Sequence, residues 1–342
     1  MKRHKKDHIG IWFEQRRNLG VNDNILMARS VSNETTQKIY QHADMDGVSC
    51  LMHFFDSFGL TYNKPPLSKA KNEPGRQEFK AIKKCSENYE TRIQWQHWNP
   101  EKHSKVEHLY SALFTLEQTQ AIQERVSIEK TSLNTWLFWT LNKACAEKLI
   151  KPSQSYSWFY PVNLRGAIDY KTLYSNYSSG FYLSLNSETS LSELSNMIRK
   201  KLKTGQYWVS WRSAKVSQFL PGFILRMLYR YLSKKQFYAG SFSSLGEWTA
   251  VKPKKESRES CKEISEDWFA CAPGTANYPI SNGILICNGK LSCTLKLHPA
   301  ITKSHEECRE VLQCWSEYLL CGTPQRTGSG QPHIKIIHST IQ

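Results

Sequence analysis

The spacing of apolar residues near the start of the chain predicts a strand, a turn and a helix. Residues 25–31 and 38–40 are short apolar runs of the kind that form strands. From Gly47 onward the apolar positions recur at helical spacing, and the run stops at Gly59. The segment 42–47 therefore lies at a predicted junction between a strand and a helix.

The remainder of the chain alternates predicted helices and strands without a strict repeat. Helical spacing occurs at residues 116–126, 133–149, 191–202, 222–232 and 304–320, with Ser132 as a predicted N-cap of the second of these. Strand patterns occur at 157–163, 180–185, 241–245, 283–287 and 291–297, the last two joined by a hairpin turn at Asn288-Gly289. A weaker strand signal lies at 91–97. This alternation is typical of an α/β or α+β layered fold.

A chain of 342 residues is long enough to form two domains. Residues 62–105 are rich in Lys, Pro, Asn and Glu and read mainly as a connection, which places a boundary near Lys105. We therefore predict an N-terminal region at 1–105, a C-terminal region at 106–322 and a flexible tail at 323–342. No apolar run approaches the roughly 20 residues that span a bilayer, and no export signal is recognisable, so a cytoplasmic location is predicted.

The net charge of +16 comes from 46 Lys and Arg against 30 Asp and Glu. Ten basic residues and no acidic one lie within residues 197–237. Such a stretch is most often a solvated face, and the alternative is a surface that receives phosphates or an acidic carrier protein. The amphipathic run 222–232 adds a second alternative, a peripheral membrane contact, although packing on the protein's own sheet is favoured. Without a recognisable nucleic-acid-binding motif, no nucleic-acid partner is expected.

Ten cysteines are scattered along the chain without a Cys-x-x-Cys pair. The densest group of metal-binding residue types lies near the C-terminal end, at His298, His305, Cys308, Cys314 and Cys321. Cys308 falls at helical spacing with apolar neighbours, so reduced thiols in a core explain this group better than a metal site. We predict no metal.

The segment 42–47 carries the pattern His-x-x-x-Asp-Gly, formed by His42, Asp46 and Gly47. A histidine with an ordinary pKa of about 6.5 is largely neutral at pH 7 and can accept a proton. Asp46 is expected to fix the turn by an ion pair or by accepting backbone N–H bonds, and Gly47 to allow the tight passage into the helix. The alternative is an ordinary histidine in a surface turn.

Five motifs in order resemble the chloramphenicol acetyltransferase-like superfamily, which includes peptide-synthetase condensation domains and alcohol acyltransferases. They are Gln41-His42-Ala43-Asp44-Met45-Asp46-Gly47, Pro161-Val162-Asn163-Leu164-Arg165-Gly166, Ser175-Asn176-Tyr177-Ser178-Ser179-Gly180, Ser243-Ser244-Leu245-Gly246 and the hairpin Ile284-Leu285-Ile286-Cys287-Asn288-Gly289-Lys290-Leu291. The resemblance implies two α/β subdomains in a V around a central channel. Because only 41 residues precede the motif, the first subdomain is expected to be incomplete.

The resemblance also implies a function and a set of roles. The protein would transfer an acyl group from a CoA or carrier-protein thioester to a hydroxyl or amine acceptor, without a permanently bound cofactor. His42 would be the general base, and Gly47 and Ser244 would be candidate oxyanion donors. Asp46 would be structural, and Asn163 and Arg165 would brace the second subdomain near the channel.

The short N-terminal region leaves two questions open. The arginine that commonly pairs with the motif aspartate in this superfamily lies upstream of the motif, and the candidates to replace it here are Arg16, Arg17, Arg29 and Arg165. An inactive relative that binds acyl chains or a protein partner through the same cleft is the alternative to an active transferase.

Overall fold

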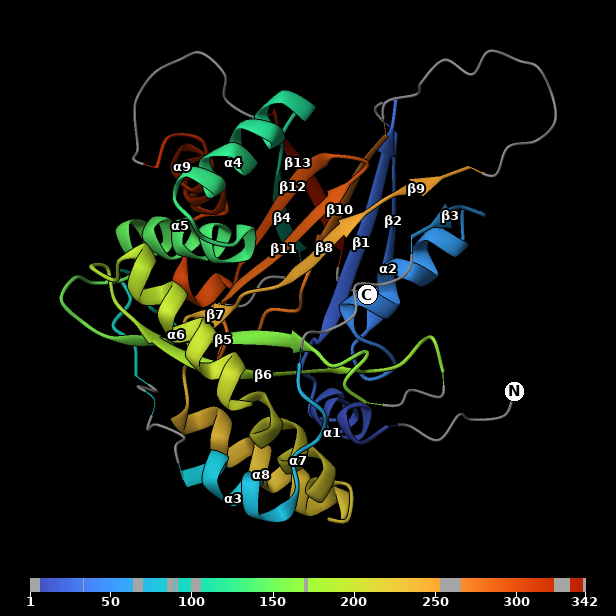
Figure 1. Ribbon diagram of the computed structural model, residues 1–342, viewed down its shortest axis with the longest axis vertical. Coiled ribbons are helices and arrows are strands. Elements are labelled where there is room, and N and C mark those ends of the chain that lie inside the picture. Colours follow the sequence, from blue (N-terminus) through green and yellow to red (C-terminus); the bar gives the residue numbers. More distant parts are fainter. Residues whose placement is uncertain are drawn as a thin grey trace.

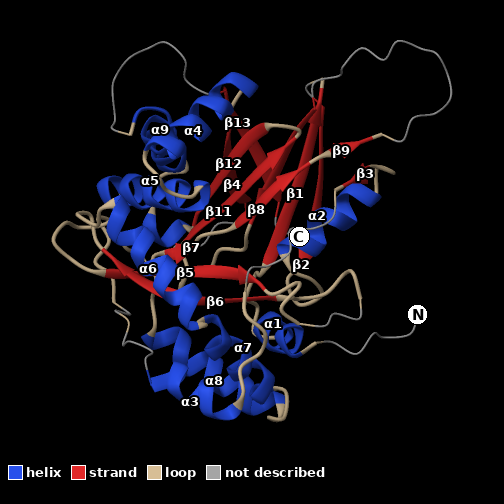
Figure 2. Cartoon of the chain, in the orientation of Figure 1, coloured by secondary structure: helices blue, strands red, loops and turns tan. Residues whose placement is uncertain are grey.

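The computed structural model describes residues 7–32, 34–63, 70–84, 89, 92–99, 106–168, 172–252, 266–322 and 333–340. A large mixed sheet runs through the molecule and helices cover it (Figures 1 and 2). The expected α/β class is therefore confirmed. The boundary predicted near Lys105 lies outside the described residues, and the division of the chain into two regions stays a prediction.

The large sheet has eight strands in the order β13-β4-β12-β11-β7-β5-β6, with β8 also paired to β11. Its strands are β4 (Val106–Leu113), β5 (Tyr156–Asn163), β6 (Ser178–Leu185), β7 (Gly240–Ser241), β8 (Ser244–Trp248), β11 (Ile280–Cys287), β12 (Lys290–Leu297) and β13 (His333–Thr340). The predicted hairpin between β11 and β12 is confirmed. Asn288 and Gly289 both have positive φ, 50° and 80°, as a tight two-residue turn requires.

A second sheet of three strands supports the motif segment. It has the order β10-β1-β2, from β1 (Asn24–Val31), β2 (Glu34–Gln41) and β10 (Glu266–Cys271), and both neighbours of β1 run antiparallel to it. A short pair joins β3 (Thr61–Tyr62) to β9 (Ala250–Val251). Because β10 comes from the predicted C-terminal region, the two predicted regions share this sheet.

The helices of the described residues are α1 (His8–Arg17), α2 (Gly47–Asp56), α3 (Arg76–Lys84), α4 (Leu116–Ile128), α5 (Leu133–Lys148), α6 (Leu191–Thr204), α7 (Tyr207–Ser217), α8 (Gly222–Lys235) and α9 (Glu306–Cys321). The predicted N-cap of α5 is confirmed, since Ser132 Oγ accepts the Thr135 N–H at 3.2 Å. Figure 1 shows α3, α7 and α8 gathered at one end of the molecule, with α1 beside them.

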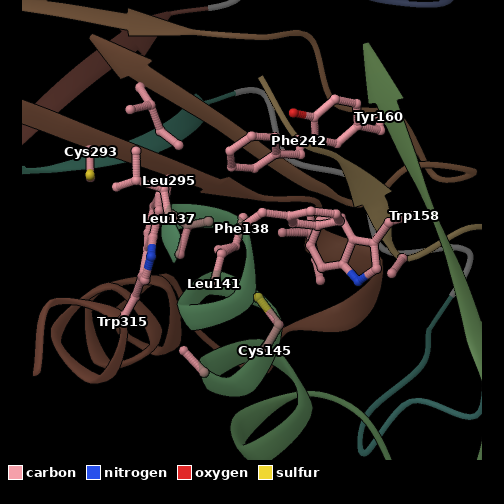
Figure 3. Packing of buried hydrophobic residues seen from close by; sticks show 14 of the residues in the cluster. Leu137, Phe138, Leu141, Cys145, Trp158, Tyr160, Phe242, Cys293, Leu295 and Trp315 are labelled. Atoms are coloured by element: carbon pink, nitrogen blue, oxygen red, sulfur yellow. The ribbon is translucent and has the colours of Figure 1, made fainter. Parts of the chain in front are cut away.

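Two buried clusters hold these layers together. In the larger one, α5 and α9 pack on the large sheet, and Figure 3 shows Leu137 and Phe138 of α5 among Trp158, Leu295 and Trp315. The tight fit of such aromatic and aliphatic side chains is what removes apolar area from water.

The smaller cluster anchors α2. Phe54 and Phe55 of this helix pack edge-on against Trp268 of β10, with ring centroids 5.8 and 5.0 Å apart. The helix that begins at the motif is therefore fixed by its apolar face, as its periodicity predicts. Tyr40 near the end of β2 belongs to the same buried cluster, so packing supports the chain on both sides of the motif.

Several elements escaped the sequence pattern, and two expectations differ from the structure. Apolar spacing did not predict α1 or α7, because their polar and apolar residues are not segregated to separate faces. It also did not predict α3, β4 or β10, and α3 is only nine residues long. The strand signal at 91–97 corresponds to no strand in the described residues, where Trp95 forms an isolated bridge to Ile150. Residues 333–340, assigned to a flexible tail, instead form β13 and pair antiparallel with β4; residues 323–332 and 341–342 lie outside the described residues.

Most cysteines of the described residues are buried thiols. Seven of the described cysteines are buried, and Cys321 at the end of α9 is exposed. Burial raises the pKa of the Cys287 thiol to about 12, so it stays protonated at neutral pH.

Across the ranges described above, no helix is both long and apolar enough to cross a bilayer.

The two sheets approach each other closely at Gly283. A Cβ built on this residue would lie 1.9 Å from the Ala270 carbonyl oxygen of β10. No real Cβ tolerates such a distance to backbone, so glycine is required here for the sheets to meet.

We predict that Gly283→Ala lowers the free energy of unfolding by about 1–3 kcal/mol, because the added methyl group overpacks a backbone contact. Urea titration followed by tryptophan fluorescence measures the change. Gly75→Ala is the control, since a Cβ there meets nothing within 4 Å. Equal stability of the two variants would contradict the close contact.

Candidate active site

A buried ion pair between Asp46 and Arg165 lies at the centre of the candidate site. Arg165 Nη1 donates to Asp46 Oδ2 at 2.9 Å, and Nη2 donates to Asp46 Oδ1 at 2.8 Å. The side chains are 1% and 3% exposed for Arg165 and Asp46. Bidentate, charge-assisted pairs fix orientation as well as distance. The pair thus joins the start of α2 to the end of β5.

Asp46 also accepts two backbone hydrogen bonds, one from α2 and one from the segment 175–177. The Ser49 N–H donates at 3.0 Å, so Asp46 is the N-cap of α2, and the Tyr177 N–H donates at 2.7 Å. Arg165 Nη2 reaches Ser49 Oγ at 2.6 Å. One carboxylate therefore joins the turn, the helix and the 175–177 segment.

The electrostatics of this pair favour the charged carboxylate. Burial opposes ionisation of Asp46, but the Arg165 guanidinium and the N–H groups of Ser49 and Tyr177 outweigh burial and hold the pKa of the carboxyl below its ordinary value. The pair therefore stabilises the fold above the unfolded-state pKa of Asp46. This contribution is lost as the pH falls through the lower pKa of the folded state.

Of the four candidate arginines, Arg165 is the one that pairs with Asp46. The other three candidates pair elsewhere: Arg16 with Asp23, Arg17 with Glu14 and Arg29 with Glu266. The sequence did not decide which of the four arginines pairs with Asp46. The structure shows that it is the one farthest along the chain.

His42 directly follows β2 and is half-buried. Its backbone N–H donates to the Asp23 carbonyl at 3.2 Å, and its ring stacks on Phe13 of α1 with centroids 3.9 Å apart and planes 13° from parallel. The ring is therefore held on one face by an aromatic side chain. The backbone bond fixes the strand end from which it projects.

Asn176 determines which nitrogen of the His42 ring carries the hydrogen. Asn176 Oδ1 lies 3.1 Å from His42 Nδ1, while the backbone N–H and Nδ2 of Asn176 donate to Asp7 Oδ2 at 3.1 and 3.4 Å. Because Asp7 takes the amide N–H groups, the amide oxygen faces the imidazole and accepts its Nδ1–H. Nε2 is left without a hydrogen-bond partner among the described residues.

A cavity of about 770 Å³ opens at this point of the structure. Its wall includes parts of α1, β1, β5, β6, α7, α8 and β8. All of the residues that the sequence singled out line it: His42, Asp46, Gly47, Asn163, Arg165 and Ser244. The fold therefore brings together residues that are up to about two hundred positions apart in the sequence.

The remaining predicted residues differ in what their polar groups contact. Gly47 is the first residue of α2, where a backbone N–H has no acceptor within the helix. Ser244 Oγ donates to Asn134 Oδ1 at 2.9 Å. Asn163 Oδ1 accepts the Arg165 backbone N–H at 3.0 Å and Arg165 Nη1 at 3.3 Å, so it braces the arginine of the central pair.

Sequence reasoning missed the contribution of α1. Asp7, Phe13 and Asn176 hold the imidazole, yet only Asn176 lay in a recognised motif, and it had been given no role. The available signal was the helix N-cap pattern, in which Asp7 accepts the Gly10 N–H at 2.6 Å.

In the part of the chain that the structure describes, no group of three His, Cys, Asp or Glu residues could hold a metal ion.

No protein family and no curated protein matches this chain, but solved structures do. It is similar to the epimerization domain from the third module of tyrocidine synthetase B, with 13% identity over 84% of this chain and 68% of that one, and a TM-score of 0.53. The trichothecene 15-O-acetyltransferase TRI3 from Fusarium sporotrichioides is 12% identical over 93% and 75% of the two chains, with a TM-score of 0.49. The first likeness shows a shared fold, which confirms the fold that the resemblance implied.

We predict that Asp46→Asn lowers the free energy of unfolding by about 3–5 kcal/mol, because it keeps a capping oxygen but leaves the buried Arg165 charge uncompensated. Chemical unfolding at neutral pH measures the loss. The control is Glu129→Gln, which breaks an exposed ion pair with Arg125 and is expected to cost less than about 1 kcal/mol. A loss as small as that of the control would contradict the proposed importance of the pair.

Proposed function

We propose that this protein is an acyltransferase that moves an acyl group from a CoA or carrier-protein thioester to a hydroxyl or amine acceptor, with His42 as general base. The observation that carries the proposal is the oriented imidazole in the cavity. Nδ1 is engaged by Asn176, so the lone pair lies on Nε2, the nitrogen without a protein partner among the described residues. A base needs this combination of fixed geometry and access.

The proposed reaction moves one proton and one acyl group. His42 Nε2 takes the proton from the acceptor O–H or N–H as the acceptor heteroatom attacks the thioester carbonyl carbon. A tetrahedral oxyanion forms, and its collapse breaks the carbon–sulfur bond. The leaving thiolate receives the proton from the His42 imidazolium, which restores the neutral base. General-base assistance of this kind contributes typically about 10²–10⁴-fold to the rate.

The backbone N–H of Gly47 is the better candidate for stabilising the oxyanion. It lines the cavity at the N-terminus of α2, where the helix dipole favours negative charge and the N–H has no intrahelical acceptor. The Ser244 hydroxyl also lines the cavity, but it would have to leave Asn134 to donate to an oxyanion.

The buried pair of Asp46 and Arg165 supports this function without touching the reacting atoms. It fixes the helix start that carries the Gly47 N–H and the turn that follows His42. A small displacement of a base or an oxyanion donor lowers the reaction rate strongly, so a rigid turn favours catalysis here. Asn163 contributes by holding the arginine.

The experiment that tests the proposal starts with the donor. Thermal unfolding is followed with and without CoA, acetyl-CoA and longer acyl-CoAs, because a ligand at about 100 times its dissociation constant stabilises by about 2.7 kcal/mol. Donors that raise the midpoint are then incubated with panels of alcohols and amines, and free thiol is measured. Stabilisation without thiol release for any acceptor would favour an inactive protein that binds acyl donors.

We predict that His42→Ala lowers kcat by about 10²–10⁴-fold while the donor still raises the unfolding midpoint, because the base is lost and the cavity is kept. Thiol release under saturating donor measures the change. His305→Ala, at an exposed histidine that precedes α9 and does not line the cavity, is the control and should retain full activity. Equal activity of the two variants would exclude His42 as the base.

We predict that Asn176→Ala lowers kcat less than His42→Ala does and leaves KM unchanged. Without the Asn176 oxygen, Nδ1–H loses its acceptor and the tautomer with hydrogen on Nε2 becomes populated, which cannot accept the proton. Steady-state kinetics separate kcat from KM. A change confined to KM would indicate that Asn176 acts on substrate binding instead of on the base.

A further inference from the structure

The exposed apolar residues of this protein are concentrated on one segment. Of the sixteen large apolar side chains exposed among the described residues, eight lie within residues 216–231. They are Val216, Phe219, Leu220, Phe223, Ile224, Met227, Leu228 and Tyr231. Phe219 is 79% exposed and Met227 is 66% exposed. A concentration of exposed apolar side chains is typical of an interaction site, whereas single exposed ones are ordinary.

Helix α8 presents its apolar residues on the side that faces away from the protein. Phe223, Ile224, Met227, Leu228 and Tyr231 fall within an arc of about 140° when each residue advances by about 100°. The opposite side packs against the protein through Leu225, which is fully buried, and through Tyr229, whose ring centroid lies 6.0 Å from that of Trp12 of α1. The helix is therefore anchored on one face and unpartnered on the other within the described residues.

The polar groups around this apolar face are basic. Arg230 and Lys234 lie along one edge of the arc, and Lys235 extends it at the C-terminal end, where its Nζ donates to the Tyr231 hydroxyl at 3.0 Å. No acidic residue occurs between 197 and 237. The cations of α7 differ, because Arg212 and Lys215 pair with Glu73. Positive charge is therefore available next to the apolar face of α8 itself.

The same segment forms part of the cavity wall. Leu228 is 40% exposed and also lines the cavity, and Leu232 lines it one turn later. On α7, Val209, Ser213 and Ser217 line the cavity. Leu228 therefore belongs both to the exposed apolar face and to the cavity wall.

We propose that the segment 216–235 binds the surface of an anionic lipid bilayer, with the apolar face of α8 in the interface and its basic residues on the lipid headgroups. An amphipathic helix with large apolar side chains flanked by Arg and Lys, and without acidic residues, has the chemistry of interfacial membrane helices. An acidic surface of a partner protein would pair with the basic residues but would not bury the exposed aliphatic and aromatic side chains.

Flotation of the purified protein with vesicles tests this proposal. Vesicles of phosphatidylcholine with and without 30% phosphatidylserine (roughly the anionic content that attracts basic segments) are compared at low and high salt. The protein should float with the anionic vesicles, and less so at high salt. Binding to neither kind of vesicle at low salt would overturn the proposal.

Two pairs of variants separate the apolar and electrostatic contributions. Phe219→Ser with Met227→Ser, and Arg230→Glu with Lys234→Glu, should each weaken vesicle binding by about tenfold or more. The matched controls are Ile128→Ser with Val251→Ser, at exposed apolar residues elsewhere, and Lys151→Glu with Lys303→Glu. Equal weakening by the control variants would overturn the assignment to this face.

A second copy of the chain is the competing occupant of the apolar face. Light scattering over a range of protein concentrations decides this: a dimer that Phe219→Ser with Met227→Ser dissolves would overturn the proposal. The His42→Ala variant should float as the wild type does. Membrane binding therefore stands or falls independently of acyl transfer.

Discussion

The buried ion pair of Asp46 and Arg165 is the interaction on which the site depends. Its guanidinium comes from the end of β5 and its carboxylate from the start of α2, and the carboxylate also accepts the Tyr177 N–H. A buried carboxylate is tolerated when it is paired and hydrogen-bonded, and four N–H donors satisfy this one. On the guanidinium both terminal nitrogens donate, while Nε has no partner among the described residues. The pair therefore fixes the strand end, the helix start and the segment behind the histidine in one arrangement.

The N-terminal helix completes the setting of His42 in a different way. Asp7 orients the amide of Asn176, Phe13 covers one face of the imidazole, and Arg16 pairs with Asp23, whose carbonyl receives the His42 N–H. These contacts hold a ring nitrogen, a ring face and the backbone separately. A residue that acts as a base gains from all of these constraints, because each removes a direction in which the ring could turn away from a substrate.

Helix α8 contributes both to the cavity wall and to the exposed apolar face. One end of the molecule carries α3, α7 and α8, as Figure 1 shows, and the cavity wall includes residues of α7 and α8. A site for thioester chemistry benefits from the exclusion of water, since hydrolysis competes with transfer. A lipid surface against α8 would supply both an apolar phase and a source of apolar substrates for the same cavity.

The sequence by itself determined several local elements and the class of fold. Helical spacing after Gly47, the N-cap Ser132 and the Asn288-Gly289 turn depend on neighbours a few residues away, so they can be recognised without a structure. The ordered motifs also identified six residues that line one cavity. The tertiary structure alone decided that Arg165 is the partner of Asp46, that Asp7 and Phe13 hold the histidine site, and that 333–340 is an edge strand. These depend on contacts between segments more than a hundred residues apart, or on a helix whose periodicity polar residues obscure, and such contacts exist only when the whole chain has packed.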